Sequence, residues 1–348
     1  MADAEVIRLD ARVRRPSGPS RPQARMRCRA TTSTGRPCRN YAVSDEGFCK
    51  VHASQARHPS SSEPTVRISP AADEHDPEGD GFVRRRARGS YEIDDFGYDR
   101  DLSREVLLPL TRPLYERYFR VRTFGVDRIP NHGPALLVGN HSGTVAIDAV
   151  MVNFAVATEH PMERPVRNVG ADLVYQLPFI SHLARKTGAA VARDEDALEL
   201  LRRGELVGVY PEGFKGVGKG WRERYKLQRF GRGGFMELAL QMRVPIIPVA
   251  IVGAEEAFPM IANVKPLANL LRLPYFPITP TFPLLGPLGM LPLPSRWLIE
   301  FGSPIPMDDY PDDAAEDAML VFDLADRVRD TIQQMLYRNL QRRGPAFF

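Results

Sequence analysis

The sequence predicts an α/β fold whose mostly parallel sheet is covered by helices. Three apolar runs have the length of buried strands: Ala135–Gly139, Leu206–Val209 and Ile246–Val252. Segments with helical periodicity separate them along the chain. Parallel strands need a crossover connection, which is usually a helix, so this alternation favours a parallel sheet over a hairpin-based one.

The remaining elements follow from the same periodicity. A helical segment at Leu102–Arg120, interrupted by Pro109 and Pro113, presents an apolar face formed by Leu107, Leu110, Leu114, Tyr118 and Phe119. The next expected elements, in chain order, are a strand at Val121–Val126, a turn at Pro130–Pro134, the strand Ala135–Gly139, a helix at Ala146–Ala157, a strand at Pro165–Val169, short helices through Leu183, a strand at Gly188–Ala192, a helix at Glu195–Arg203, the strand Leu206–Val209, a helix at Gly234–Met242, the strand Ile246–Val252 and a long amphipathic helix at Asp313–Arg342.

Composition divides the 348 residues into four expected parts. Residues 1–25 are rich in Arg and Pro and are expected to be disordered, and residues 55–95 have the Ser, Pro and charged composition of a linker. Between them, residues 26–54 hold all the cysteines, and residues 96–345 form the main domain. A net charge of +4 is modest, so nucleic acid is not an expected partner.

We expect a cytoplasmic protein that binds the cytoplasmic face of a membrane peripherally. The first fifteen residues are charged and lack the apolar core of a signal peptide. The most apolar long stretch, Leu273–Pro294, contains seven prolines, and such a density is incompatible with a lipid-spanning helix.

The cysteine-containing segment indicates a metal site. Cys28, Cys38 and Cys49 are followed by His52, and these four soft ligands suit a tetrahedral zinc ion. Bound zinc could supply the folding energy that so short a segment lacks. We therefore predict a Cys3His zinc module of unknown partner. The alternative is three incidental thiols in a disordered tail.

Polar residues follow two of the predicted strands at the point where each strand ends. Asn140 and His141 come directly after the first, and Asp148 lies seven positions beyond the histidine. Tyr210-Pro211-Glu212-Gly213-Phe214-Lys215 follows the strand Leu206–Val209. Ligands of open α/β sheets bind at the carboxyl ends of the strands, so both groups are candidates for one site.

Several of these segments resemble the glycerolipid acyltransferases, which acylate glycerol 3-phosphate, lysophosphatidate and diacylglycerol. The resemblance is carried by the segment 140–148, Tyr210-Pro211-Glu212-Gly213, the proline-flanked block Val244–Gly253, and Phe230–Phe235, which is similar to the monoacylglycerol and diacylglycerol acyltransferase-like branch. It extends over about two-thirds of the chain, from roughly residue 100 to residue 340, with several blocks in the right order.

The resemblance implies acyl transfer from acyl-coenzyme A or acyl carrier protein to a glycerolipid hydroxyl, with no cofactor in the chemistry. His141 would be the general base and Asp148 its orienting carboxylate. Backbone N–H groups near Gly143 and Thr144 would hold the oxyanion. Glu212, Gly213, Lys215 and, more loosely matched, Arg193 would bind the acceptor or a phosphate.

One departure from the family pattern keeps other functions open. The commonest pattern has four residues between histidine and aspartate, whereas six separate His141 from Asp148, and Ala146 occupies the usual carboxylate position. A catalytically degenerate lipid-binding scaffold with a zinc module is therefore the main alternative. A serine hydrolase that uses Ser142 is a second, although the sequence around it is not G-x-S-x-G.

The sequence allows more than one role for each of two further segments. The basic loop that continues with Lys219, Arg222, Arg224, Lys226 and Arg229 would suit phosphate groups, or it is a solvated or lipid-facing loop. The apolar, proline-rich stretch Leu270–Leu293 could line an acyl groove, lie in the lipid headgroup layer, or pack against the rest of the domain.

Overall fold

The computed structural model describes residues 81–347, apart from 144, 146, 177–179 and 232. The predictions for residues 1–25, for the cysteine module and for the linker up to residue 80 therefore lie outside the described residues. Within the described part, seven strands form one sheet in the order β1-β9-β6-β2-β5-β3-β4. Their bounds are β1 Arg122–Phe124, β2 Ala135–Gly139, β3 Val166–Gly170, β4 Ala190–Val191, β5 Leu206–Val209, β6 Ile246–Val252 and β9 Leu298–Phe301.

Neighbouring strands of this sheet run parallel, except that β9 pairs antiparallel with β6. The carboxyl ends of β2, β5 and β6 therefore share one edge with the amino ends of β1 and β9. A separate two-stranded sheet joins β7 (Ala262–Asn263) to β8 (Pro277–Ile278). The predicted mostly parallel α/β fold is confirmed.

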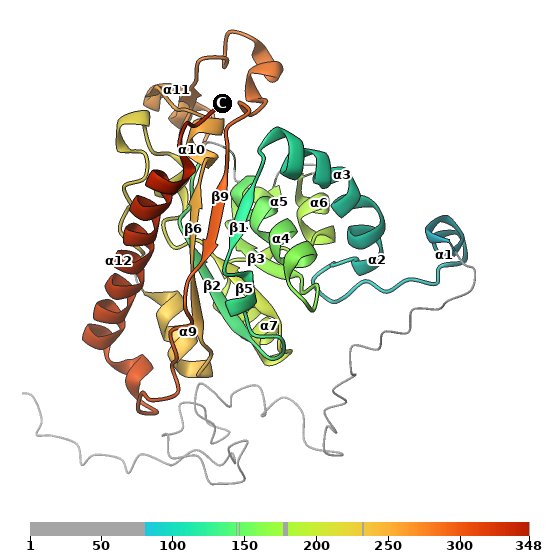
Figure 1. Ribbon diagram of the computed structural model, residues 1–348, viewed down its shortest axis with the longest axis vertical. Coiled ribbons are helices and arrows are strands. Elements are labelled where there is room, and N and C mark those ends of the chain that lie inside the picture. The colour runs from blue at the N-terminus through green and yellow to red at the C-terminus, as the bar shows by residue number, and fades with distance from the viewer. Residues whose placement is uncertain (1–80, 144, 146, 177–179, 232, 348) are drawn as a thin grey trace, which may run out of the picture. The chain divides into compact units, whose positions relative to one another are not determined.

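Helices cover the sheet on both faces (Figure 1). The helices longer than one turn that follow β1 are α4 Ile147–Glu159, α5 Asp172–Gln176, α6 Ile180–Lys186, α7 Asp194–Arg202, α9 Gly234–Met242, α11 Lys265–Leu270 and α12 Ala318–Arg343. Shorter helical turns are α8 Phe214–Val217, α10 Ala254–Ala257, η4 Val126–Arg128, η5 Trp221–Glu223, η6 Gly286–Met290 and η7 Ala314–Glu316. Within the described residues, no helix combines the length and the apolar character needed to cross a membrane.

The alternation of side chains along β2 divides the core into two layers. Leu136 and Val138 belong to a cluster with residues of α7, α9 and α12, whereas Ala135 and Leu137 pack with residues of α4 on the opposite face. All five residues of β2 and all seven of β6 are buried. Continuous apolar runs are what a parallel sheet covered on both faces requires.

Strand β9 was not predicted. Its sequence, Leu298-Ile299-Glu300-Phe301, is short and follows a proline-rich stretch rather than a helix, so the strand–helix alternation gives no signal for it. It is inserted between β1 and β6, with Ile299 opposite both Thr123 and Ile251. This strand places the amino ends of β1 and β9 beside the edge where the polar residues gather.

The segment before β1 is helical as predicted, and its predicted apolar face is correct only in part: Phe119 is buried and Leu114 packs against the core, but Leu110 and Tyr118 are exposed. It consists of α2 Arg100–Leu102, η2 Ser103–Leu107, α3 Leu108–Pro113 and η3 Leu114–Tyr118, and η2 and η3 are π-helical turns. A π turn contains more residues than an α turn and rotates the following side chains around the axis. Consequently Tyr115 and Phe119 are buried, whereas Leu110 is 74% exposed.

The compact part of the chain begins earlier than the predicted boundary at residue 96. Phe82–Arg88, inside the predicted linker, form helix α1. Arg86 forms an ion pair with the buried Asp99, and Arg85 forms one with Asp101 at 2.5 Å. These two arginines of the basic run Arg84–Arg88 thus form ion pairs within the protein.

Candidate active site

Two loops meet at the carboxyl edge of the sheet. The loop after β2 carries Asn140, His141 and Ser142, and the loop after β5 carries Tyr210–Gly213. Because β2 and β5 are neighbouring parallel strands, with Val138 opposite Val209, both loops emerge side by side. The His141 backbone N–H donates to Glu212 Oε1 at 3.0 Å, which joins the two loops directly.

Asn140 fixes the start of the first loop. Its side chain is fully buried, its Nδ2 donates to the Ile251 carbonyl at 3.0 Å, and its Oδ1 accepts from the Ile251 N–H at 2.7 Å. The side chain thus continues the pairing between β2 and β6 past the last residue of β2. Sequence reasoning assigned no role to Asn140, although a polar residue at the end of a buried strand is a signal for such a bond.

His141 and Asp148 are in direct contact. His141 Nδ1 lies 2.8 Å from Asp148 Oδ2, which also accepts the Ser142 N–H at 2.9 Å. Asp148 Oδ1 accepts the Ala149 N–H at 2.9 Å. An ionised carboxylate only accepts hydrogen bonds, so we assign the imidazole proton to Nδ1, which leaves Nε2 as the free base.

The turn between these two residues accommodates the six-residue spacing. Asp148 lies in the first turn of α4, with its side chain fully buried. Gly143 has φ +84°, and a Cβ atom there would lie 2.9 Å from the Ala254 carbonyl oxygen. Only glycine adopts such a conformation without strain at so close an approach. Thr144, the other predicted oxyanion residue, lies outside the described residues, as does Ala146.

The imidazole is held between Tyr210 and Asp148 but stays accessible. The Tyr210 ring stacks on it with 4.9 Å between centroids, and the His141 side chain keeps 16% exposure. Burial, with a smaller contribution from the charge of Asp148, raises the pKa of Tyr210 well above its usual value. Tyr210 therefore remains a neutral phenol beside the base.

Ser142 is not presented as a nucleophile. Its side chain is fully buried, and its Oγ accepts from Asn140 Nδ2 at 3.3 Å. In the described residues it has no hydrogen bond to the His141 ring. A serine nucleophile needs contact with its base and with the substrate, so this geometry argues against the serine hydrolase alternative.

Glu212 is turned into the protein. Besides the His141 N–H, its carboxylate accepts the Gln228 N–H at 2.6 Å and Lys219 Nζ at 3.2 Å, and its side chain is fully buried. These donors occupy both oxygens, so the geometry argues against direct contact of this carboxylate with an acceptor headgroup. Glu212 instead holds the loop of His141 against the loop that follows α8.

The start of helix α8 lies very close to the His141 loop, next to the contact between Glu212 and the His141 N–H. A Cβ atom at Gly216 would lie 2.6 Å from the His141 carbonyl oxygen and 2.7 Å from Glu212 Cβ. Gly213, at φ +52°, makes the preceding turn and is exposed. Glycine at both positions lets α8 begin directly against the His141 loop.

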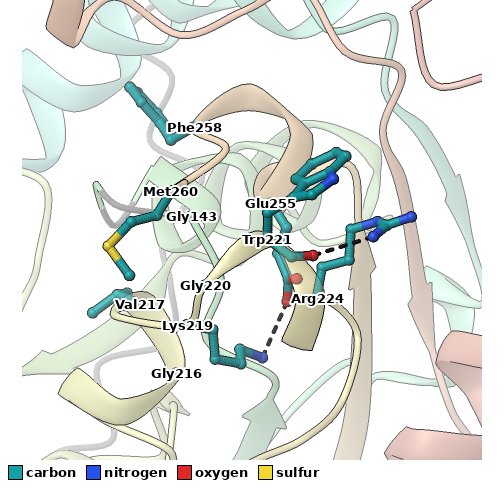
Figure 2. A pocket seen from close by; sticks show the side chains of 10 residues that line it. All are labelled: Gly143, Gly216, Val217, Lys219, Gly220, Trp221, Arg224, Glu255, Phe258 and Met260. Atoms are coloured by element: carbon teal, nitrogen blue, oxygen red, sulfur yellow. Dashed lines mark hydrogen bonds and ion pairs between the residues drawn. The ribbon is translucent and has the colours of Figure 1, made fainter. Parts of the chain in front are cut away.

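Lys219 and Glu255 extend the buried polar group, and sequence reasoning missed both roles. Lys219 Nζ lies 3.0 Å from Glu255 Oε1 as well as 3.2 Å from Glu212, and its side chain is only 4% exposed. Figure 2 shows this pair lining a small cavity, with Trp221 close to Glu255 and with Phe258 and Met260 across from them. Glu255 follows β6 by three residues, so the strand-end rule that found His141 and Glu212 also points to it.

Burial governs the protonation of this pair. Burial raises the pKa of Glu255 to about 7, against the opposing charge of Lys219. Burial lowers the pKa of Lys219, but the charges of Glu255 and Glu212 offset this effect and raise it overall. Lys219 therefore stays charged, and Glu255 is the member of the group that titrates near neutral pH.

The stability of the protein should consequently depend on pH through Glu255. Its folded-state pKa lies above the usual 4.5, so its contribution to the free energy of unfolding is fully present below pH 4.5 and is lost as the pH rises through 7. As the pH rises across this range, the free energy of unfolding of the wild type should fall by on the order of 3 kcal/mol more than that of the Glu255→Gln variant. Urea unfolding of both proteins over this pH range measures the difference, and parallel pH profiles would contradict the assignment.

The side chains of the two remaining predicted site residues do not join this hydrogen-bonded group in the described part of the chain. Lys215 is exposed on α8, next to the Glu212 corner. Arg193 follows β4, three strands from β2 in the sheet, or roughly 14 Å at the usual strand spacing. Within the described residues it has no hydrogen bond or ion pair to the other predicted site residues, so the structure does not bring it into the group.

The basic loop divides into buried and exposed members. Lys219 is buried, Arg222 and Arg224 are exposed, and Lys226 forms an ion pair with Glu223 at 3.3 Å. Cys28, Cys38, Cys49 and His52 lie outside the described residues. Among the residues that are described, no cluster of three or more His, Cys, Asp or Glu side chains could hold a metal ion.

Comparisons with known proteins identify a family and several relatives of this chain. The model of the family described as "Acyltransferase" matches residues 120–252. An uncharacterized protein of Mycobacterium tuberculosis is 50% identical over 268 residues, which cover 77% of this chain and 75% of that protein. A protein of Homo sapiens described as "DGAT1/2-independent enzyme synthesizing storage lipids" is 27% identical over 61% of this chain and 59% of its own length.

A solved structure is also similar to this chain. It is the 1-acyl-sn-glycerophosphate (LPA) acyltransferase PlsC of Thermotoga maritima, with 18% sequence identity and a TM-score of 0.46. The match covers 71% of this chain and 85% of that one.

Proposed function

The chain belongs to the acyltransferase family, and we propose that it moves a fatty acyl group from acyl-coenzyme A or acyl carrier protein to a hydroxyl of a glycerolipid. The observation that carries the proposal is the contact between His141 Nδ1 and Asp148 Oδ2 at 2.8 Å. It lies at the sheet edge where ligands of α/β proteins bind.

In the proposed step, His141 Nε2 removes the proton of the acceptor hydroxyl while the hydroxyl oxygen attacks the thioester carbonyl. Asp148 accepts the Nδ1–H bond throughout and stabilises the imidazolium that forms. The tetrahedral intermediate then collapses, the C–S bond breaks, and the ester of the acceptor is released. The leaving thiolate takes the proton back from His141, so the enzyme ends in its starting state.

The developing oxyanion needs hydrogen-bond donors. We propose that backbone N–H groups at Gly143 and its neighbour Thr144 supply them. Gly143 lines the small cavity between the His141 loop, Trp221 and Met260. No side-chain nucleophile is required, because the acceptor attacks the donor directly.

Two observations support a lipid acceptor. A relative that is 27% identical over 212 residues is described as an enzyme synthesizing storage lipids. The exposed cations Lys215, on α8, and Arg222 and Arg224, in the segment after it, follow the Glu212 corner, where they would suit a phosphate of the acceptor or of the donor. We therefore propose a lysophospholipid or an acylglycerol as the acceptor class.

A panel of lipid acceptors tests the reaction. Purified protein is incubated with isotope-labelled palmitoyl-coenzyme A and with lysophosphatidate, other lysophospholipids, monoacylglycerol or diacylglycerol, and the products are resolved by mass spectrometry. We expect labelled ester on at least one acceptor and its absence in the His141→Ala protein. Lipid binding with no labelled product from any acceptor, in either protein, would support the degenerate scaffold instead.

We also propose that Cys28, Cys38, Cys49 and His52 bind one zinc ion that stabilises the N-terminal module and takes no part in acyl transfer. Metal analysis of purified protein should find stoichiometric zinc in the wild type and a large loss in the Cys28→Ser variant, with acyl transfer preserved. Equal zinc content in the two proteins would exclude this site.

A further inference from the structure

The segment between β6 and β9 exposes an unusual number of large apolar side chains. Leu284 is 86% exposed, Leu270 77%, Leu288 67% and Ile261 64%. Leu291, Leu285, Leu271, Met290 and Leu273 are also among the exposed large hydrophobic residues. We call the exposed apolar side chains of residues 261–291 the apolar face. Single exposed leucines are ordinary, but a concentration in one segment marks an interaction surface.

The backbone that carries the apolar face is internally bonded. The Leu285 N–H donates to the Thr281 carbonyl at 2.9 Å, and Thr281 Oγ1 donates to the Gly289 carbonyl at 3.0 Å. The Ile261 N–H donates to the Ile278 carbonyl at 2.8 Å. These bonds pair polar groups within the segment while its leucines are exposed, which is a favourable arrangement for an apolar environment.

Charge narrows the choice of partner. Between Glu256 and Glu300 the sequence contains no acidic residue, whereas Lys265 and Arg272 are both present and exposed. The rim of a protein interface is ordinarily polar, whereas the interfacial layer of a bilayer attracts cations to its anionic headgroups. Leucines flanked only by cations instead match the acyl layer and the anionic headgroups of a lipid bilayer.

The apolar face adjoins the candidate active site. The Trp221 N–H donates to the Met260 carbonyl at 2.8 Å, which joins the loop after α8 to the start of the face. A Cβ atom at Gly218 would lie 3.2 Å from the Tyr275 ring, and one at Gly216 would lie 2.6 Å from the His141 carbonyl oxygen. Figure 1 shows the segment, in orange, beyond the same end of the sheet as α10, and Figure 2 shows Met260 and Phe258 at the cavity beside Gly143.

We propose that the apolar face docks the protein on a bilayer containing anionic lipids. The leucines enter the boundary between headgroups and acyl chains, and Lys265 and Arg272 contact lipid phosphates. This contact brings the sheet edge with His141 to the surface that holds the lipid acceptor. The docking itself stands on the exposed side chains, and only this delivery of the acceptor rests on the proposed acyltransferase function.

Vesicle flotation tests the docking. The probes are vesicles of phosphatidylcholine alone and of equal parts phosphatidylcholine and phosphatidylglycerol. The Leu284→Asp/Leu288→Asp protein should bind the mixed vesicles at least about tenfold more weakly than the wild type, because burial of one leucine corresponds to about that factor. Vesicles without phosphatidylglycerol should bind the wild type more weakly as well.

The matched control replaces two exposed apolar residues on α12. Met319 is 76% exposed and Tyr337 is 52% exposed, so Met319→Asp/Tyr337→Asp introduces the same charge change away from the apolar face. This control should retain vesicle binding, and all three proteins should have the same unfolding midpoint. Equal vesicle binding by all three would overturn the proposal. So would a loss of self-association on leucine substitution with vesicle binding intact, because the face would then join two copies of the chain.

An activity measurement separates this inference from the proposed function. The Leu284→Asp/Leu288→Asp protein should lose transfer to acceptors embedded in vesicles but keep transfer to a dispersed short-chain acceptor. Leucine-dependent vesicle binding without any acyl transfer would refute the function and leave the docking face standing. Leucine-independent vesicle binding together with active transfer would refute the docking face alone.

Discussion

Replacing His141 with alanine is expected to lower kcat for acyl transfer by about 10³-fold, within the range that a positioned general base contributes. The substitution removes the Nε2 base and one of the three donors to Asp148, and the backbone N–H groups of Ser142 and Ala149 continue to hold the carboxylate. Loss of one such hydrogen bond should change the free energy of unfolding by about 1–2 kcal/mol. Steady-state kinetics with a saturating donor and urea unfolding measure the two effects separately.

His132→Ala is the matched control for this experiment. His132 is exposed in the turn before β2, at the opposite edge of the sheet from His141. Its replacement should leave kcat unchanged. If His141→Ala retained full activity, or if both histidine variants lost activity equally, the assignment of the base would be wrong.

Replacing Lys219 with methionine is expected to be the most destabilising of these changes, at about 3–5 kcal/mol. The ammonium group lies between Glu212 and Glu255, at 3.2 and 3.0 Å, and its loss leaves two buried carboxylates without a cation. Glu212 also accepts the His141 N–H, so the catalytic loop should loosen at the same time. Urea unfolding measures the stability, and kcat reports on the loop.

Two comparisons isolate the cause of this effect. Lys219→Met combined with Glu255→Gln replaces one of the two buried carboxyl groups by a neutral amide and should recover part of the lost stability. Lys226→Met is the surface control: Lys226 is 61% exposed and pairs with Glu223, so its loss should cost at most about 1 kcal/mol. An effect of Lys219→Met no larger than that of Lys226→Met would show that the buried ion group contributes little.

The central strands of the fold could be predicted because a strand that is buried on both faces appears in the sequence as a continuous apolar run. The runs Leu206–Val209 and Ile246–Val252 were predicted with the bounds that the structure gives them. Strand β9 could not be predicted, because its place is set by pairing with β1 and β6 rather than by its own four residues. The π turns before β1 likewise leave no periodic signal, so the predicted apolar face included Phe119, which is buried, but also Leu110, which is exposed.

For the candidate site, the positions of the residues could be predicted but their contacts could not. The strand-end rule brings His141, Asp148 and Glu212 to one edge, and the structure places them in one hydrogen-bonded group. What each side chain contacts could not be read from the sequence, because Glu212 looks equally suited to a ligand or to a buried cation. Lys219 was grouped with the exposed cations of its loop, although it is the one that enters the core beside Glu255.

A double-mutant cycle on His141 and Asp148 tests the central claim most directly. If Asp148 acts only by orienting the His141 imidazole, Asp148→Asn should lower kcat/KM about 10²-fold in the wild type and have no further effect in the His141→Ala protein. Such non-additivity would identify the two residues as one catalytic unit. An equal loss in both backgrounds would contradict the account, because Asp148 would then act independently of the histidine.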